Sequence, residues 1–388
     1  MKDTRIKKIQ KIFLVLPVSR FDRNMFYPRG KKYLDMFINI GIEKIYIIIW
    51  NDDGKQGFFR FNNTVTIFKA SKKSFSRGKF SINYFLSYMD FLNESKKLLK
   101  KYFNPKTDLV IGNKQHSEPL MHYVLQNLFA KNVFLDISDI HSLDYKNKKS
   151  LPYHLVYMFI RYFENKIKNK LSGVIISSPG FLDFYSRLLI QKNIFIFENI
   201  PDYYIKEKLR GDNFKKNIKI NIKKPKVGFV GVFRFFKNYL PIINLASKNL
   251  IYFYVYGIDI HNTLNNFDGV VFYGPYLNSY EKLKKIYSSF DITAIIYPDI
   301  GNHKYALPNK LYESIFFKKP ILASKGTYLG EIVKNYKIGE VVELKKPDTY
   351  KLKIDKIIKN YQNYLDNIDK IQDKYDYQKT ENQLISYI

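Results

Sequence analysis

The chain contains no cysteine among its 388 residues. This absence excludes disulfide bonds, thiolate metal sites, iron–sulfur clusters and a cysteine nucleophile. Long apolar runs are also missing, because the longest, such as residues 45–50, are only the size of a strand, whereas a membrane-spanning helix needs about 18 apolar residues. The apolar run at residues 12–16 is too short for the core of a signal peptide. We therefore expect it to form the first strand of a cytoplasmic protein.

Acidic residues are scarce, with 35 against 65 basic ones, which gives a formal net charge of +30. Residues 1–200 carry 34 basic and 16 acidic side chains (+18) and the rest carry 31 and 19 (+12), so the excess is not a basic tail. The positive electrostatic potential that this excess creates would attract nucleic acid, an anionic membrane surface or a phosphorylated substrate. The abundance of Lys, Ile, Asn and Tyr also fits a base-composition bias of the gene. The motifs typical of nucleic-acid binding are missing, so we expect no nucleic-acid partner.

Short β-rich runs alternate with longer segments of helical period, which is typical of parallel sheets with crossover helices. The first half predicts strands at 12–16, 44–50, 64–68, 109–111, 133–137, 174–177 and 194–198, with helices at 31–40, 82–103, 118–129, 151–171 and 181–190. The second half predicts strands at 227–230, 251–256, 270–273, 292–296, 321–323 and 339–342, with helices at 239–248, 279–288, 309–317, 328–335 and 348–364.

This alternation predicts an α/β protein of two facing, Rossmann-like, doubly wound parallel-sheet domains with a ligand cleft between them. The expected domains are an N-terminal Rossmann-like domain (1–205), an interdomain linker (206–226), a C-terminal Rossmann-like domain (227–365) and a helical tail (366–388).

The most informative segment lies between the predicted strands 292–296 and 321–323. Pro308 and Asn309 provide a helix start there, directly after a polar loop. A helix N-terminus at the carboxyl edge of a parallel sheet can bind phosphate through its free N–H groups, and Lys310 would add a full charge. Glu313, one turn further on, suits hydrogen bonds from the vicinal hydroxyls of a sugar. The alternative is that Lys310 and Glu313 form an ordinary i,i+3 surface pair.

The run Pro308-Asn309-Lys310-Leu311-Tyr312-Glu313, followed by residues 319–323, resembles the donor-binding signature of GT-B glycosyltransferases, specifically of glycosyltransferase family 4. The resemblance implies that Glu313 binds the ribose of a nucleotide-diphospho-sugar and that Lys310 lies near the diphosphate. Asn309 and Leu311 would belong to the same donor site.

Further segments follow the family's order along the chain. Residues 227–231 with Arg234 and Lys237 resemble its first C-domain strand, and residues 270–276 resemble its strand and glycine loop. The resemblance implies that Gly231, Arg234 and Lys237 face the diphosphate and that Tyr276 lies near the nucleobase. Other matching segments are 133–140, the helix containing Glu164, 174–180, 197–202 and 287–291.

Two positions depart from the family's pattern. Tyr305 stands eight residues before Glu313, where many members have a second glutamate that helps hold the transferred sugar. Val232 follows Gly231 where the family has an arginine, and Arg234 comes two residues later. We expect Arg234 to serve the same phosphate from a shifted turn, the alternative being a structural arginine.

Transfer from such a donor expels a diphosphate, which the enzyme must neutralise with a metal or with cations and helix amides. No acidic D-x-D loop that would clearly hold a metal is found, so we expect no cofactor and no metal, and assign catalytic roles to Arg234, Lys310 and Asp139. The resemblance implies retention of the anomeric configuration.

Acceptor-side candidates follow strand ends of the first half. Asp136, Asp139 and His141 follow one predicted strand. The family places there a polar residue that touches the donor sugar, with Asp139 as the first choice and His141 as the second. Helix or turn capping is the alternative for either.

Three further acceptor-side candidates lie elsewhere in the first half. His116 and Glu118 follow the predicted strand 109–111, where a capping role is the favoured alternative. Arg29 lies in the segment 20–30, which matches the family's flexible loop before its first helix.

The leading interpretation is a retaining hexosyltransferase-type enzyme that adds a sugar to a saccharide acceptor, expected to be polyprenyl-linked, in capsular, exopolysaccharide or lipopolysaccharide synthesis. Glycosylation of a protein or small metabolite, or a non-catalytic partner subunit, remain as alternatives, with a sugar-nucleotide epimerase less favoured. Residues 151–170 and 71–101 are basic and aromatic, as an interfacial helix would be, so an anionic membrane surface is a further candidate partner. Packing into the core is the usual role of such aromatic stripes.

Overall fold

A computed structural model describes residues 9–16, 28–51, 54–74, 82–114, 116–140, 151–185, 193–201, 224–276 and 279–388. The chain divides into two compact units. Unit 1 comprises residues 1–198 together with 380–388, and unit 2 comprises residues 199–379.

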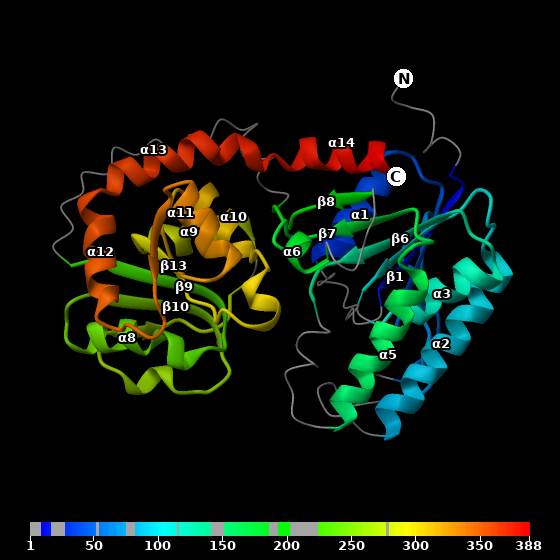
Figure 1. Cartoon of the computed structure of the whole chain (residues 1–388), viewed down its shortest axis with the longest axis horizontal. Helices are drawn as coiled ribbons and strands as arrows, with labels where there is room; N and C mark the ends of the chain where they lie inside the picture. Colours follow the sequence, from blue (N-terminus) through cyan, green and yellow to red (C-terminus); the bar gives the residue numbers. More distant parts are fainter. Residues whose placement is uncertain are drawn as a thin grey trace. The chain divides into compact units, whose positions relative to one another are not determined.

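Unit 1 is built on one eight-stranded sheet of order β3-β4-β2-β1-β5-β6-β7-β8 (Figure 1). Its strands are β1 (Lys11–Leu16), β2 (Lys44–Ile49), β3 (Gly57–Arg60), β4 (Val65–Lys69), β5 (Leu109–Asn113), β6 (Asn132–Ile137), β7 (Gly173–Ile176) and β8 (Ile194–Ile196). All neighbours pair in parallel except β3 and β4, which are antiparallel. Its helices are α1 (Pro28–Asn39), α2 (Ile82–Tyr102), α3 (Glu118–Asn127), α5 (Leu151–Ile167), α6 (Phe181–Tyr185) and most of α14 (Tyr377–Tyr387).

Unit 2 is built on a six-stranded parallel sheet of order β11-β10-β9-β12-β13-β14. Its strands are β9 (Lys226–Phe233), β10 (Tyr252–Asp259), β11 (Val270–Phe272), β12 (Ile292–Ile295), β13 (Ile321–Ser324) and β14 (Gly339–Val342). Its helices are α8 (Phe236–Ser247), η2 (Leu264–Asn266), α9 (Tyr280–Ser288), η3 (Gly301–Lys304), α10 (Asn309–Phe316), α11 (Tyr328–Asn335), α12 (Thr349–Lys359), α13 (Tyr361–Gln372) and η4 (Asp373–Tyr375). This is the doubly wound order, in which the direction of winding reverses between β9 and β12.

The prediction of two doubly wound α/β units is confirmed, with two local differences. The antiparallel edge strand β3 was not predicted, and the single helix expected at 348–364 is two helices that meet at Asn360. Within unit 1, Tyr387 near the end of α14 stacks on Phe195 and packs edge-on against Phe134. Gly173 makes room for it, because a Cβ there would come within 2.3 Å of the Tyr387 hydroxyl. Residues 380–388 therefore complete the sheet surface of unit 1.

Candidate functional site

The start of α10 forms the centre of the site in unit 2. Pro308 precedes the helix in an extended conformation (φ −78°, ψ 154°) and supplies no side-chain cap to the first turn. The helix ends where Lys318 adopts a left-handed conformation (φ 53°), with Pro320 just beyond. Its amino end therefore presents amide N–H groups without a side-chain cap, as an anion site requires.

Lys310 lies in the first turn of α10 and is half-buried. Its ammonium group donates a 2.9 Å hydrogen bond to the Tyr297 hydroxyl and lies 4.7 Å from the centre of the Phe229 ring. Cation–π contact and the hydrogen bond both fix the long side chain, which reduces the conformational entropy lost when it binds an anion. The cation is thus held ready near the carboxyl ends of β9 and β12.

Gly231, near the end of β9, lies directly against this cation. Its backbone has φ 116°, which side-chain-bearing residues rarely adopt, and a Cβ there would come within 3.1 Å of Lys310 Cε and Nζ. Glycine is therefore needed both for the conformation and for the room that Lys310 occupies.

Glu313 is buried one turn deeper in α10, with 8% of its surface exposed. Tyr287 donates a 2.7 Å hydrogen bond to its Oε2. Burial raises the pKa of the Glu313 carboxyl, and the Tyr287 hydrogen bond and the Lys310 charge offset part of that rise. Lys310 and Glu313 thus have separate partners and do not behave as an ordinary surface pair. A buried carboxylate that accepts one hydroxyl can accept others, as binding of a vicinal diol requires.

Tyr276 lies near Glu313 beyond the end of β11. Burial raises the pKa of its phenol well above the usual value, and the negative charge of Glu313 raises it further. Tyr276, which follows β11, and Glu313, in α10, are thus close enough for the charge of one to affect the pKa of the other.

The two other predicted cations, Arg234 and Lys237, are exposed at the β9–α8 turn. Neither side chain forms an ion pair with another described residue, and the Arg234 carbonyl oxygen lies 3.0 Å from His261 Nε2. Their exposed ends are accessible to an anion. Of the remaining predicted donor residues, Asn309 is exposed, Tyr305 is half-buried just after η3, and Leu311 is fully buried in the core.

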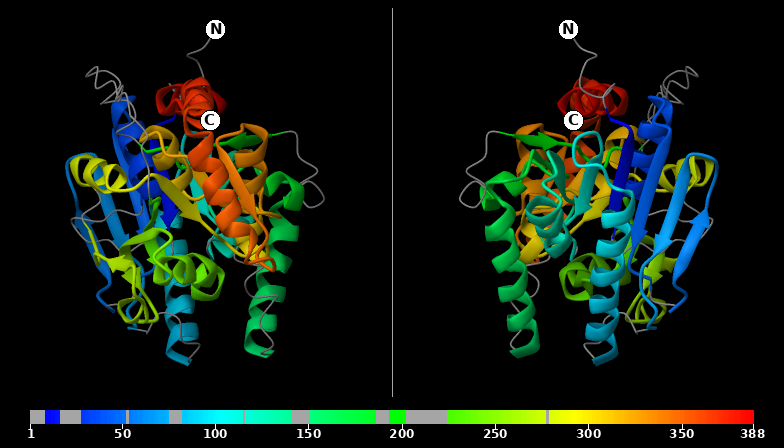
Figure 2. Two further views of the ribbon diagram at one scale, coloured as in Figure 1. Left: turned by 90° about the vertical axis from the view of Figure 1, so that its left-hand side faces the viewer. Right: turned by 90° about the vertical axis from the view of Figure 1, so that its right-hand side faces the viewer.

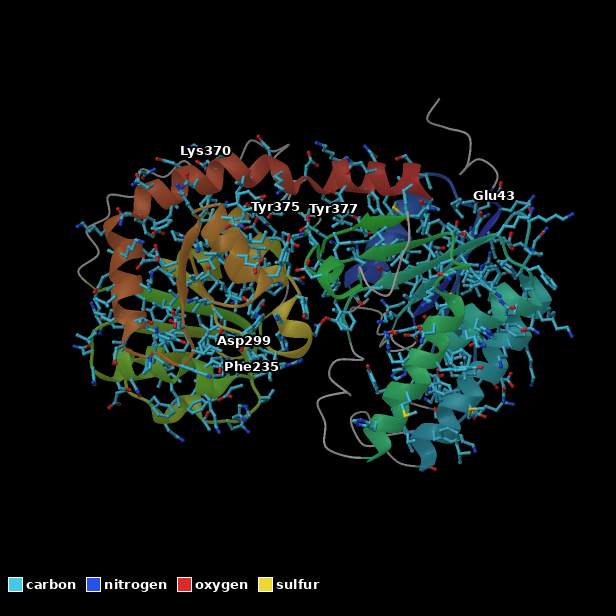
Figure 3. The ribbon with its side chains drawn as sticks, in the orientation of Figure 1. Glu43, Phe235, Asp299, Lys370, Tyr375 and Tyr377 are labelled. Atoms are coloured by element: carbon cyan, nitrogen blue, oxygen red, sulfur yellow. The ribbon has the colours of Figure 1, made fainter. Side chains whose placement is uncertain are left out.

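Sequence reasoning missed an aromatic group beside Lys310. Phe235 and Tyr297 pack edge-on, with ring centres 5.7 Å apart, and His303 lies 4.8 Å from Phe235 and 5.2 Å from Tyr297. Phe235 is labelled in Figure 3. The position of Tyr297 just past the buried strand β12 is the sequence signal that could have identified it.

The predicted acceptor residues Arg29 and Asp136 are buried in unit 1, 2% and 1% exposed, and bind each other. Arg29 Nε donates to both Asp136 oxygens at 2.8 Å, its Nη2 donates to Oδ1 at 2.5 Å, and its Nη1 donates to the Phe197 carbonyl at 2.5 Å. Asn113 adds a 3.2 Å hydrogen bond to Oδ2. The pair therefore ties α1 to β6 and to the end of β8, and its polar atoms are already satisfied inside the protein.

Of the other acceptor-side candidates, Asp139, His116 and Glu118 lie within the described residues. Asp139 is half-buried just past β6, and His141 lies outside the described residues. His116 adopts a left-handed conformation (φ 70°), with its ring packed edge-on against Trp50 and its carbonyl accepting a 3.0 Å hydrogen bond from Tyr88.

Glu118 is the first residue of α3 and is fully buried. Burial raises the pKa of its carboxyl to about 8, while the charge of Lys114 acts in the opposite direction. Lys114 forms a 2.6 Å ion pair with Glu164, which also pairs with Arg161 at 2.6 Å. Glu118 therefore lies beside a buried ionic network.

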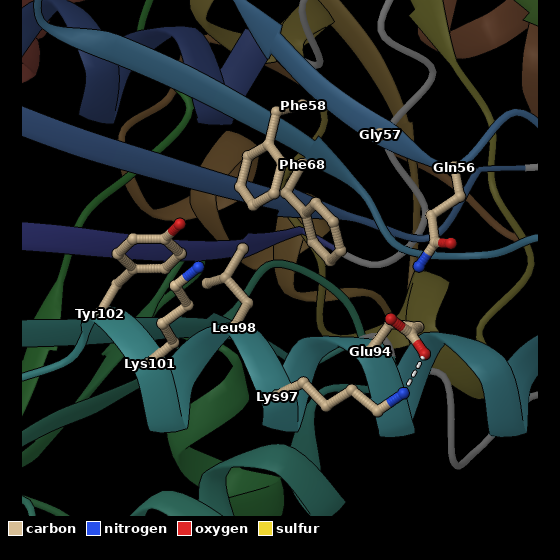
Figure 4. Close-up of a pocket in the computed structure, with 9 residues that line it drawn as sticks. All are labelled: Gln56, Gly57, Phe58, Phe68, Glu94, Lys97, Leu98, Lys101 and Tyr102. Carbon is tan, nitrogen blue, oxygen red and sulfur yellow. Dashed lines mark hydrogen bonds and ion pairs between the residues drawn. The ribbon is translucent and has the colours of Figure 1, made fainter.

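A pocket of about 340 Å³ lies between β3, β4 and the second half of α2 (Figure 4). Phe58, Phe68 and Tyr102 form its aromatic wall, and the Glu94–Lys97 ion pair lies at its rim. None of the predicted donor, acceptor or catalytic residues line it. Among the described residues, no group of three or more His, Asp or Glu side chains is placed to hold a metal ion.

Residues 211–375 match the family described as glycosyl transferases group 1. No curated protein matches the chain in sequence. The fold is similar to that of sucrose-phosphate synthase from Thermosynechococcus elongatus (TM-score 0.69, 14% identity, 97% of both chains covered).

Two other solved structures are similar over nearly the whole chain. One is WaaG, a glycosyltransferase involved in lipopolysaccharide biosynthesis (TM-score 0.61, 13% identity, covering 96% of this chain and 98% of that one). The other is HepE from Anabaena in complex with UDP (TM-score 0.58, 13% identity, covering 97% and 98%). The chain thus has the fold of GT-B glycosyltransferases, and its residues 211–375 carry the sequence signature of glycosyl transferases group 1.

Proposed function

We propose that the chain is a retaining glycosyltransferase that transfers a hexosyl-type sugar from a nucleotide-diphospho-sugar to a lipid-linked saccharide acceptor in the synthesis of a surface polysaccharide. The observation that carries this proposal is the start of α10, where Lys310 and the buried Glu313 have separate partners at the carboxyl edge of the sheet. Its position beside the β9–β12 switch point is where doubly wound sheets bind nucleotides. The family match and the UDP complex of HepE support the same kind of donor.

In this mechanism the acceptor hydroxyl oxygen forms a bond to the anomeric carbon, on the face from which the diphosphate leaves. The bond from that carbon to the diphosphate oxygen breaks, and the hydroxyl proton passes to the departing diphosphate. The leaving diphosphate gains negative charge, which Lys310, Arg234, Lys237 and the α10 amides would neutralise without a metal. Glu313 would hold the ribose and so fix the position of the diphosphate. Asp139 would contact the donor sugar from unit 1. We further propose that the protein works in the cytoplasm at the inner face of the plasma membrane.

The test is thermal stabilisation by UDP-, GDP-, TDP- and CMP-sugars, first without and then with a divalent metal. A ligand at a hundredfold excess over its Kd stabilises the folded state by about 2.7 kcal/mol, which a melting curve resolves. Glu313→Ala should abolish the response, whereas Glu331→Ala, which removes an exposed carboxylate on α11, should leave it unchanged. Lys310→Ala should mainly lower turnover.

A response to one nucleotide class, lost in Glu313→Ala, would identify the donor base. Absence of any response would overturn the proposal in favour of a non-catalytic partner subunit. That alternative is suggested by Tyr305, which stands where many family members have a second glutamate. A response that appears only with metal would refute metal-independent catalysis.

A further inference from the structure

Two helices of unit 1 are longer than the strands that they cover. At 1.5 Å per residue, the 21 residues of α2 span about 31 Å and the 17 residues of α5 about 25 Å. The strands β5 and β7, which follow these helices in the chain, have five and four residues and span about 17 Å and 13 Å. Each helix ends near the start of its strand, so its amino-terminal turns extend past the carboxyl edge of the sheet (Figure 1 and Figure 2).

These projecting turns are apolar where a solvated helix would be polar. We define the α2–α5 tip as a set of exposed side chains on these two helices: Phe85, Leu86, Met89, Leu155, Met158, Phe159 and Tyr162. Phe85 and Met158 are 59% and 61% exposed. Residues 155, 158, 159 and 162 form one continuous stripe because they recur at helical spacing. No described segment of unit 1 buries this surface.

The two halves of the tip belong to one surface. The Tyr88 ring of α2 lies 6.5 Å from the Phe159 ring of α5, edge to face. Both helices also pack against α3, which lies between them. An exposed apolar surface of this extent on a single soluble unit usually marks an interaction site.

The charges beside the tip are mainly positive. Lys72 and Lys73 are exposed next to α2, where the Lys73 carbonyl accepts a 3.0 Å hydrogen bond from Ser87. Lys166 is exposed in the last turn of α5, away from the projecting amino-terminal turns, and its ammonium group lies 5.5 Å from the centre of the Tyr162 ring. Against these cations stand two carboxylates of α2, Asp90 and Glu94. Glu94 pairs with Lys97, and the charge of Lys72 also lowers the pKa of its carboxyl. The α5 carboxylate, Glu164, is buried in its ion pairs. Apolar side chains flanked by lysines match the chemistry of an anionic lipid surface.

We propose that the α2–α5 tip docks unit 1 onto an anionic bilayer. A projecting pair of helix ends can insert among lipid headgroups without a complementary surface, which a second copy of the chain would have to supply. No described helix has the length and apolarity to cross a membrane, so the contact is peripheral. The purpose of this docking rests on the proposed function, because a lipid-linked acceptor lies in the bilayer. The features of the surface come from unit 1 alone.

The experiment is co-sedimentation of the full chain with vesicles. Vesicles of phosphatidylcholine with about one third phosphatidylglycerol should bind the protein, pure phosphatidylcholine should bind it more weakly, and high salt should reduce but not abolish the binding. The variant Phe85→Ser/Met158→Ser/Phe159→Ser should lower the partition coefficient by about tenfold or more, because it removes most of the inserted apolar area.

The matched control is Phe129→Ser, which removes another aromatic side chain of unit 1, 77% exposed and outside the tip. It should bind vesicles as the wild type does. Equal melting temperatures of the three proteins would show that the substitutions do not unfold the chain. Lack of vesicle binding by the wild type, or equal binding by the triple variant, would overturn the proposal.

Sedimentation velocity without lipid tests whether a second copy of the chain, and not a bilayer, covers the α2–α5 tip. A wild-type dimer that the triple variant fails to form, together with no vesicle binding, would assign the tip to a second copy instead. The nucleotide-binding test of the proposed function uses water-soluble ligands and unit 2. A protein that binds vesicles but no nucleotide would therefore refute the proposed function and leave the docking surface standing.

Discussion

Removal of Arg29 tests whether the Arg29–Asp136 pair is structural or binds an acceptor. In Arg29→Ala the carboxylate of Asp136 would lose three hydrogen bonds and its counter-charge, and would keep the hydrogen bond from Asn113 within the core. Removing one member of a buried ion pair costs about 3–5 kcal/mol, because the other charge is left uncompensated. With a urea dependence of about 2–3 kcal/mol per molar for a unit of this size, the unfolding midpoint should fall by about 1–2 M.

The chain carries its own probe for this measurement. Its single tryptophan, Trp50, is buried in unit 1 and donates a 2.8 Å hydrogen bond to Ser87, so its fluorescence reports the unfolding of that unit. Arg60→Ala is the matched control, because this exposed arginine bonds only to its neighbours Asn62 and Asn63 among the described residues, and its loss should change stability by less than about 0.5 kcal/mol. An unchanged midpoint for Arg29→Ala with loss of acceptor turnover would refute the structural interpretation and restore the acceptor role.

Three further predictions concern the two units separately. Tyr297→Phe removes the hydroxyl that holds Lys310, so kcat should fall several-fold with little change in melting temperature; an unchanged kcat would show that the hydroxyl does not position the cation. Gly231→Ala forces a strained backbone and displaces Lys310, and should weaken nucleotide binding by about tenfold in calorimetry; wild-type affinity would contradict the close approach. Burial raises the pKa of Glu118 above the value of an unfolded chain, to about 8, so its contribution to stability is complete below about pH 4.5 and is lost as the pH rises through 8. Glu118→Gln should therefore flatten the pH dependence of unit 1 unfolding over that range, and an unaltered profile would show that Glu118 is not responsible.

Most of the fold could be predicted because each strand buried in a parallel sheet is a short apolar run between turns. The strand β3 could not, since Gly57-Phe58-Phe59-Arg60 is largely exposed and has no alternation that distinguishes it from a loop. It becomes a strand only because the edge of β4 offers hydrogen bonds, which is tertiary information. The end of α12 at Asn360 could not be predicted either, because the helical spacing of apolar residues continues from α12 into α13.

The donor site was partly predictable because α10 places Lys310 and Glu313 one turn apart in sequence. Their partners come from elsewhere: Tyr287 lies at the end of α9 and Tyr297 follows β12, so only the sheet order brings them to α10. The pairing of Arg29 with Asp136 spans 107 positions and could not be read from spacing. Whether polar residues at strand ends face a ligand or one another depends on packing, which the spacing of residues along the chain does not give.

The return of residues 380–388 to unit 1 affects the order in which the chain can fold during synthesis. Leu384 and Tyr387 cover the β7–β8 side of the first sheet, yet they are made after the whole of unit 2. A nascent chain that has reached residue 198 therefore lacks part of its own sheet cover, and that side stays open to water or to chaperones until residues 380–388 have been made. For the same reason, a fragment cut at residue 198 would expose Phe134 and Phe195 and should aggregate, whereas one that also carries residues 380–388 on a short linker should not.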